Sequence, residues 1–420
     1  MPKELPLRIT QDPSHGFTRH PASTIRHPDL VLTLDTYAED HIRARAYGTA
    51  LPPSPHEYTA RLDVSPATVR SSAARLRTLW KRELVAYEPV DQATGMPVSE
   101  PYATRMDLTD EPGLTEILDE LAEQGAYLLW HELLGAGGRG ADRLRRVVQE
   151  ALTSEKPLRI RVDSPLFLPW PMLALPTGAE ENPLHRFLGY RHQLEQTGGR
   201  YADFPDESDP QLPPPVPVVS LNHDKNIDPY GRTRAADVAT ALAEGTVCVE
   251  RSRRDELLAA LKSGRMDDQL MYFWCHGRFE AAQDAGAPLL VVRLTDSQDI
   301  DAHTVLARRT AGLLPYRPLV LFNACYAGLP GGADLTYLGG ALITAGAGGV
   351  LGPQIEMPQV FAAEYAYAFV TRYLGAADTA GEIAHTLARH FADTFRNPLG
   401  FAYALHCGMD RRLERTAPVL

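Results

Sequence analysis

Short apolar runs alternate with longer amphipathic segments throughout the second half of the chain. The apolar runs have the continuous hydrophobicity of strands buried on both faces of a sheet, and the amphipathic segments have helical spacing. Strands separated by helices in this way predict βαβ units and a mostly parallel sheet, which is an α/β fold. The expected strands are residues 216–222, 246–250, 269–277, 318–325, 348–353 and 401–408, and the expected helices are 232–245, 253–264, 338–346 and two within 358–395.

The first half of the chain mixes strand and helix patterns without that regular alternation. Ser65 and Pro66 suit the N-cap and the first position of a helix, and a Pro-Trp-Pro corner lies within residues 164–175. These signals predict an α+β region. Its expected strands are residues 30–38, 41–48, 57–64 and one from residue 158, and its expected helices are 65–80, 113–134 and 141–153.

An acidic, proline-rich segment, DFPDESDPQLPPPVP, lies between the two halves. Neither a helix nor a central strand can run through so many prolines, so this segment is the best candidate for a linker. The chain therefore divides into a flexible N-terminal arm (1–28), an N-terminal α+β companion region (29–204), the linker (205–217) and an α/β domain (218–420).

Composition narrows the classes of function that fit this plan. The chain has 420 residues and a formal net charge of −11, which argues against non-specific binding to nucleic acid or to an anionic membrane. Its four cysteines show no CxxC spacing, so we expect a reducing compartment and no structural zinc. The sequence has no signal-peptide core and no run of about 18 apolar residues, which predicts a soluble, cytoplasmic protein with no membrane segment.

Cys325 lies where a predicted buried strand runs out into a loop, in the sequence LVLFNACYAG. His276, followed by Gly277, lies at the corresponding end of another predicted strand. Because ligands of open α/β sheets bind at the carboxyl ends of the strands, neighbouring strands would place both side chains at one rim. A cysteine alone at such a place is usually part of the core, and a histidine alone is usually a hydrogen-bonded structural residue, but the pair together favours a catalytic role.

This pair has the groups that acyl transfer through a thiol requires. An adjacent imidazole can take the thiol proton, or stabilise the thiolate, and can then protonate a leaving amine. We therefore expect Cys325 to be the nucleophile and His276 to be the general base and acid. The backbone N–H groups of Gly277 and Cys325 are the expected oxyanion hole, since Gly277 lacks a Cβ and would let a substrate carbonyl approach.

With these motifs the chain resembles the CHAT family of caspase-like cysteine peptidases, whose relatives include separases, paracaspases and caspases. The segments YFWCHGRF and LFNACYAG are similar to the family's His-Gly and Ala-Cys-x-x-Gly blocks. The His–Cys spacing of about 50 residues is also typical of caspases. The resemblance covers roughly residues 110–415. It implies a caspase-like sheet flanked by helices in the catalytic domain (218–420), preceded by a pseudo-protease-like companion.

The resemblance also implies a function. It implies peptide-bond cleavage by a Cys/His dyad, carried here by Cys325 and His276, with neither metal nor cofactor. The implied partners are a protein or peptide substrate and an activating regulatory or sensor protein. Many members carry repeats in the same chain and this one shows none, so the implied sensor is either the N-terminal region or a separate protein. The implied setting is a bacterial defence system, such as antiviral defence, or a programmed-death system.

Three side chains are candidates for the substrate pocket. Asp224 follows a predicted strand, Asn323 lies two positions before Cys325, and Glu356 lies in GPQIEMP, where many family members have a tryptophan. The two carboxylates favour a basic residue before the scissile bond (P1). A neutral or apolar P1 residue is the alternative, with Asp224 then a solvated loop residue.

Two other functions fit parts of the sequence. Residues 62–84 look like the turn and recognition helix of a helix-turn-helix, but the strand-like segment before them and the acidic chain argue against direct nucleic-acid binding. The main alternative to a peptidase is a catalytically idle caspase-fold scaffold that supports protein–protein assembly.

Overall fold

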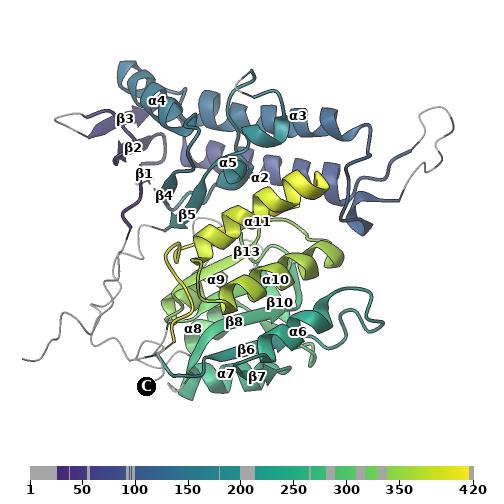
Figure 1. Cartoon of the computed structure of the whole chain (residues 1–420). Coiled ribbons are helices and arrows are strands. Elements are labelled where there is room, and N and C mark those ends of the chain that lie inside the picture. The colour runs from purple at the N-terminus through teal and green to yellow at the C-terminus, as the bar shows by residue number, and fades with distance from the viewer. Residues whose placement is uncertain are drawn as a thin grey trace, which may run out of the picture.

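The computed structural model describes residues 26–415, except for 37, 54–56, 91–93, 95, 97–99, 179, 199–212, 264–265, 281–288, 309–316 and 330–337. Among these residues, an 11-stranded sheet runs through the molecule (Figure 1). From edge to edge its strands are β3 (Tyr58–Leu62), β2 (Ile42–Tyr47), β1 (Leu30–Asp35), β4 (Arg159–Asp163), β5 (Gln193–Thr197), β14 (Tyr403–His406), β13 (Gly349–Pro353), β12 (Leu319–Asn323), β8 (Asp268–Trp274), β6 (Val218–His223) and β7 (Val247–Arg251).

Most neighbouring strands of this sheet are parallel, and the antiparallel pairs are β1–β2, β2–β3 and β13–β14. The central strands β8, β12 and β13 are buried along their whole length. Burial on both faces is what the continuous apolar runs of the sequence predicted. The α/β class, with a mostly parallel sheet flanked by helices, is therefore confirmed.

Helices cover both faces of the sheet. In β8, Leu270 and Tyr272 contribute to a hydrophobic core shared with α10 and α11, while Met271 and Phe273 face a second core shared with α7 and α9. None of the described helices is long and apolar enough to cross a membrane. The α-helices are α2 (Pro66–Trp80), α3 (Leu114–Ala126), α4 (Arg139–Leu152), α5 (Leu188–Arg191), α6 (Ala235–Ala243), α7 (Arg254–Ser263), α8 (Ala302–Ala307), α9 (Leu338–Thr344), α10 (Gln359–Leu374) and α11 (Ala380–Phe395), and the shorter turns are η1 (Lys81–Val85), η2 (Tyr102–Thr104), η3 (Tyr127–Leu133), η4 (Trp170–Met172), η5 (Pro183–Arg186) and η7 (Pro398–Ala402).

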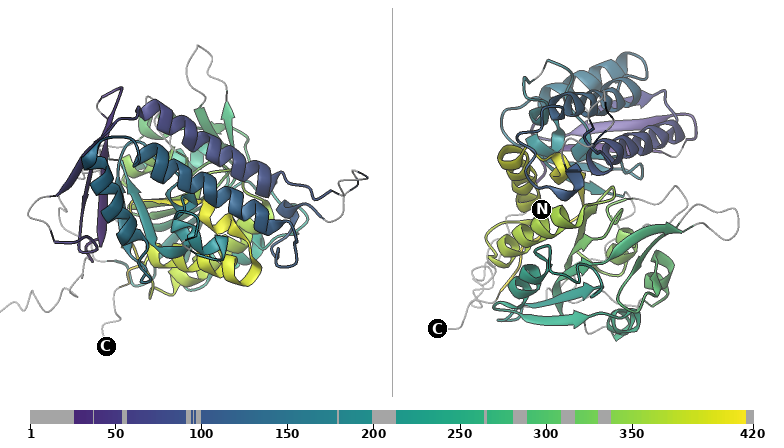
Figure 2. Two further views of the ribbon diagram at one scale, coloured as in Figure 1. Left: turned by 90° about the horizontal axis from the view of Figure 1, so that it is seen from above. Right: turned by 90° about the vertical axis from the view of Figure 1, so that its right-hand side faces the viewer.

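Helix α2 begins as the sequence predicted. The backbone N–H of Thr68 donates to Ser65 Oγ at 3.0 Å, so Ser65 caps the helix, and Pro66 occupies its first turn. The helix passes at Trp80 directly into the π-helical turn η1. Helices α2 and α3 pack side by side over the N-terminal half (Figure 2).

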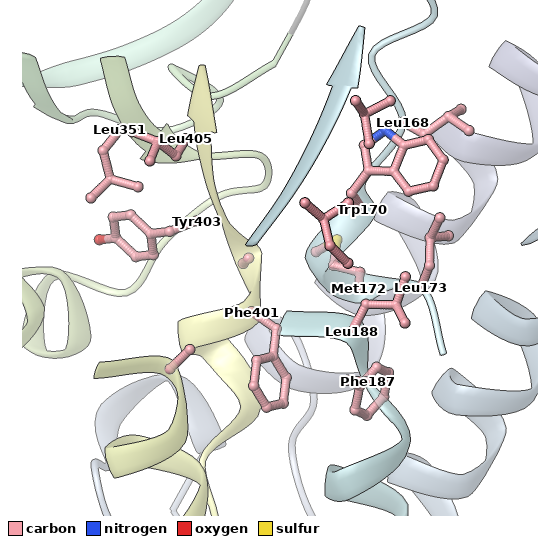
Figure 3. Close-up of a cluster of buried hydrophobic side chains, with 14 of the residues drawn as sticks. Leu168, Trp170, Met172, Leu173, Phe187, Leu188, Leu351, Phe401, Tyr403 and Leu405 are labelled. Atoms are coloured by element: carbon pink, nitrogen blue, oxygen red, sulfur yellow. The ribbon is translucent and has the colours of Figure 1, made fainter. Parts of the chain in front are cut away.

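The two halves of the chain share one sheet and one core. Strand β5 pairs in parallel with β14, with Gln196 opposite His406. At this junction Phe187 from the N-terminal half faces Phe401 from the C-terminal half, with ring centroids 5.3 Å apart, and Trp170, Leu188, Leu351 and Leu405 belong to the same core (Figure 3). The predicted arm (1–28) and linker (205–217) lie mostly outside the described residues.

One predicted strand is in fact two. The apolar pattern predicted a single strand over residues 269–277, but β8 ends at Trp274, and His276 opens β9 (His276–Glu280). Strand β9 pairs with β10 (Leu289–Arg293), and β10 pairs with β11 (Asp299–Ile300), which gives a separate three-stranded sheet. The side chains of β9 are mostly exposed. Cys275 is still part of the second hydrophobic core, but no residue of β9 belongs to it.

A buried ion pair links β7, the edge strand of the sheet, to β8 across the intervening β6. Arg251 at the end of β7 donates from both terminal nitrogens to the Asp268 carboxylate at 2.7 and 3.1 Å, and the two side chains are 8% and 2% exposed. Breaking such a pair leaves a buried charge without compensation.

We expect Asp268→Asn to lower the free energy of unfolding by about 3–5 kcal/mol, because the guanidinium of Arg251 would stay buried without its counter-charge. Urea denaturation followed by circular dichroism would measure this loss. Glu57→Gln is the control, since Glu57 pairs with Arg45 at the surface and should change stability by less than about 1 kcal/mol. Equal effects of the two substitutions would contradict the prediction.

Candidate active site

Cys325 and His276 lie at the carboxyl ends of neighbouring parallel strands. The pairing of β8 with β12 places Trp274 opposite Asn323. His276 and Cys325 each follow two positions later, so they leave the sheet at the same level. The structure therefore brings the predicted nucleophile and the predicted base together at one edge of the sheet, as expected for ligand sites of α/β folds.

Gly277 packs directly against the peptide group of Cys325. A Cβ built on Gly277 would lie 2.1 Å from the backbone oxygen of Cys325 and 3.2 Å from its backbone nitrogen. Real Cβ atoms do not approach backbone atoms so closely, so a side chain is excluded at this position. The sequence suggested that the missing Cβ makes room for a substrate carbonyl. In the structure that space is occupied by the peptide group of Cys325.

The thiol of Cys325 is half-buried, and burial raises its pKa. The backbone N–H of Met357 lies near enough to the sulfur to oppose this shift, and the carboxylate of Glu356 adds to it. The ammonium of Lys81 also lowers the pKa of the thiol, as a smaller contribution. Since an ordinary thiol is already mostly protonated at neutral pH, Cys325 is a neutral thiol in this arrangement.

His276 is exposed at the start of β9. Within the described part of the chain, no hydrogen bond joins its ring to the Cys325 sulfur or to another group. The two predicted catalytic residues therefore lie at the same edge of the sheet, and no described hydrogen bond joins their side chains. Catalytic hydrogen bonds are often long in unliganded enzymes and shorten when substrate binds.

A charged cluster lies beside the thiol. The hydroxyl of Tyr326 donates to Glu356 Oε1 at 2.9 Å, and Lys81 Nζ donates to the same oxygen at 2.7 Å. Tyr326 itself has a left-handed backbone, with φ of 63°, and its ring packs 5.0 Å from that of Phe279 on β9. Burial and the contact with Glu356 raise the pKa of Tyr326 to about 12. The predicted pocket residue Glu356 is thus paired with a lysine from the N-terminal half.

Asp224 lies at the same edge of the sheet as the dyad. It follows β6, whose last residue, His223, is opposite Trp274. Its backbone N–H donates to the carbonyl of Trp274 at 2.9 Å, and its carboxylate accepts from the backbone N–H of Asn226 at 2.9 Å. The residue is 8% exposed. It therefore presents little surface in this structure, although no cation is paired with it among the described residues.

Asn323 points into the core instead of toward the thiol. Its Nδ2 donates to the carbonyl of Ala362 in α10 at 2.7 Å, and its Oδ1 accepts from the hydroxyl of Tyr403 in β14 at 2.7 Å. It is 4% exposed. Both ends of the amide are engaged within the fold, so Asn323 ties β12 to its neighbours and does not line a pocket in this structure.

Two side chains of the N-terminal half reach the site, which the sequence pattern does not predict. Arg77 on α2 donates to Gln354 Oε1 and to the carbonyl of Phe167 at 3.0 and 2.8 Å. Lys81, one helical turn later, binds Glu356. The only available signal was the spacing of these two cations on one face of the helix. Two of the cations in residues 62–84, the segment that resembles a recognition helix, are therefore bound to residues of the C-terminal half.

The remaining cysteines are less suited to reaction. Cys275 and Cys407 are buried, which raises the pKa of both thiols well above the ordinary range. Cys248 on β7 is half-buried, and its thiol pKa is also raised by burial. All four thiols are free. The His, Cys, Asp and Glu side chains that the structure describes form no group that could hold a metal ion.

Two crystal structures of the Saccharomyces cerevisiae separase–securin complex are similar to this chain, at 9% and 11% identity and TM-scores of 0.44 and 0.42. Each alignment covers 90% of this chain but 30% of the other, so this chain spans less than a third of their length. No curated protein matches it. The family model of the CHAT domain matches residues 138–405, which is more than half of the chain and includes both His276 and Cys325. The chain belongs to the CHAT domain family.

Proposed function

We propose that this protein is a cysteine endopeptidase that cleaves a protein substrate through a dyad of Cys325 and His276. The observation that carries the proposal is the placement of the two residues at aligned ends of β12 and β8, with Gly277 packed on the Cys325 peptide group. Thiol-based acyl transfer needs a thiol and an imidazole held close enough for proton transfer between them. Membership of a caspase-like family adds to this support.

The reaction would run in two steps. Cys325 Sγ forms a bond to the carbonyl carbon of the scissile peptide while His276 takes the thiol proton, and the imidazolium then protonates the leaving amine as the C–N bond breaks. Water, deprotonated by His276, next attacks the thioester, and the thiolate leaves and regains a proton. The backbone N–H groups of Gly277 and Cys325 are the proposed donors to the oxyanion.

An activating partner fits the state of the site. The thiol is neutral, and its sulfur makes no hydrogen bond to the imidazole among the described residues. Binding of a regulatory or sensor protein would shorten the distance between these groups and so start catalysis. On family membership alone, we propose that this activity belongs to a bacterial defence or programmed-death system.

Asp224 is the strongest candidate for recognition of a basic P1 residue. It lies at the edge of the sheet that carries His276 and Cys325, and no cation is paired with it in the described part of the chain. Glu356 already pairs with Lys81, and the amide of Asn323 is engaged within the core. A neutral or apolar P1 residue stays the alternative, because Asp224 has little exposed surface.

A catalytically idle scaffold is the second candidate function. The raised thiol pKa and the missing thiol–imidazole hydrogen bond would both suit a chain that uses the caspase-like fold only for assembly. The two functions differ in whether Cys325 is selectively reactive and whether His276 affects that reactivity.

We expect Cys325→Ala and His276→Ala each to reduce substrate cleavage by about a thousandfold or more, since the two residues act as one unit. Cleavage would be measured with the full chain, on proteins encoded beside its gene and on a fluorogenic peptide panel. Cys248→Ala is the matched control, because Cys248 is also half-buried but lies on β7, and it should cleave like the wild type. Equal iodoacetamide labelling of all four cysteines, unchanged by His276→Ala, would contradict the peptidase and favour the scaffold.

The pH dependence of Cys325 alkylation should be steep. Because burial raises the pKa of the thiol, the thiolate fraction at pH 7 is small and grows as the pH rises toward that pKa. The rate of iodoacetamide modification should therefore increase about tenfold per pH unit between about pH 7 and 9. Mass spectrometry of the Cys325 peptide would measure it. A rate that levels off below about pH 8 would mean that the thiolate is already stabilised, contrary to this expectation.

Peptidyl ketone probes with Arg or Lys at P1 should label Cys325 faster than probes with Glu or Asp. Asp224→Asn should reduce the preference for Arg over Leu by about tenfold, because it removes the negative charge proposed to face the P1 side chain. Glu250→Gln, which removes a surface carboxylate that pairs with Lys225, should leave the preference unchanged. A requirement for an acidic P1 residue would exclude the assignment.

A further inference from the structure

Two cations on one face of helix α2 and its continuation hold the segment that follows β13. Arg77 binds Gln354 through Nε at 3.3 Å and Nη2 at 3.0 Å, and Lys81 binds Glu356 at 2.7 Å. The two cations are four residues apart along a helix, and their two partners are two residues apart. One face of the helix therefore matches one face of an extended segment. Together Arg77 and Lys81 connect the N-terminal half to the segment Gln354–Met357, which forms a wall beside the thiol of Cys325.

The wall itself is short and is fastened on several sides. Gln354 donates its backbone N–H to the carbonyl of Ala402 at 2.9 Å, and the backbone N–H of Tyr326 donates to the carbonyl of Ile355 at 3.3 Å. The last residue of the wall, Met357, follows Glu356, and its backbone N–H lies near the Cys325 sulfur. The orientation of that N–H group therefore depends on how Gln354 and Glu356 are held.

Arg77 is placed at an energetic cost. Its guanidinium is surrounded by protein atoms, which lowers its pKa to about 9. Its described acceptors are neutral, namely the side-chain oxygen of Gln354 and the carbonyl of Phe167. Desolvating a charge without a counter-charge is unfavourable, whereas the rigid fork of arginine is well suited to fixing the position of its acceptors. We take this geometry as a sign of positioning and not of stabilisation.

Lys81 acts on the thiol through charge as well as through position. Glu356 would be an unpaired anion beside Cys325 if the ammonium of Lys81 were removed. The carboxylate raises the pKa of the Cys325 thiol and the ammonium lowers it. The other titratable groups around the site are Tyr326, His276, Cys275 and Tyr403, with Asp224 beyond Cys275.

We propose that Lys81, from the N-terminal half, is a positioning residue for the Cys325 site: by binding Glu356 it neutralises the carboxylate beside the thiol and fixes the Gln354–Met357 wall, with Arg77 as the second anchor. The proposal rests on the proposed function to the extent that Cys325 is the reacting group. It assigns the N-terminal half a direct part in the reactivity of the thiol.

The test uses the full chain and the rate of Cys325 alkylation by iodoacetamide as a function of pH. Lys81→Met should slow alkylation at pH 7.5 by about threefold to tenfold, because an uncompensated Glu356 disfavours the thiolate. Lys81→Arg, which keeps the charge, should react like the wild type. Arg82→Met is the matched control, since Arg82 lies on the same turn but pairs with Glu83 at the surface, and it should stay within about twofold of the wild type.

Glu356→Gln removes the negative charge beside the thiol but keeps a side chain of similar size, so it separates the effect of that charge from the effect of the side chain's bulk. It should accelerate alkylation in the wild-type background and restore most of the rate to Lys81→Met, because the harmful carboxylate is gone. Retained circular dichroism and melting temperature would confirm that each variant is folded. Identical pH–rate profiles for Lys81→Met and Arg82→Met, or a Glu356→Gln variant as slow as Lys81→Met, would overturn the proposal.

The same variants distinguish this inference from the proposed function. If alkylation changes as expected while the wild type cleaves no peptide or protein in the panel, the peptidase assignment fails and the role of Lys81 stands. If the wild type cleaves and Lys81→Met matches Arg82→Met in alkylation, kcat and KM, the peptidase stands and the role of Lys81 is refuted.

Discussion

The parallel pairing of β8 with β12 determines where every group of the candidate site lies. Its register places Trp274 opposite Asn323, and the two residues after each deliver His276 and Cys325 to the same edge. Because both faces of these strands are buried, a slip of one residue would exchange side chains between two different hydrophobic cores. The register that packs the cores is therefore also the register that aligns His276 with Cys325. Because Gly277 has no side chain, the start of β9 can lie against the peptide group of Cys325.

The N-terminal half contributes to the same edge by a different route. The sheet continues from β5 into β14, so the two halves share hydrogen bonds and a core. Helix α2 and the turn η1 extend from the N-terminal half to the segment after β13. There Arg77 donates to Gln354, and Lys81 donates to Glu356. The wall beside Cys325 is built by residues from both halves, and its charge is balanced across the boundary between them.

The parts that could be predicted from sequence depend on local signals. The continuous apolar runs indicated the parallel sheet, Ser65 and Pro66 indicated the start of α2, and His276 and Cys325 stood out at strand ends. The break after Trp274 is not predicted, because Cys275 is still apolar and the pairing of β9 with β10 in a separate sheet leaves no local signal. The position of Asn323 two residues before Cys325 predicts a pocket residue, whereas its amide is engaged by Tyr403 and Ala362. The Lys81–Glu356 pair could not be predicted, since no local pattern links residues so far apart in the chain.

The position of β14 has a consequence for the order of folding. This strand is among the last elements of the chain, yet it inserts between β5 and β13 in the middle of the sheet. Pairing Gln196 with His406 closes a very long loop, and contacts of this kind form late. Until β14 is in place, Gln354 lacks its bond to Ala402 and Asn323 lacks its bond to Tyr403. A nascent chain that does not yet include β14 would therefore carry Cys325 without a finished site, so the thiol cannot reach its folded environment before β14 is synthesised and paired.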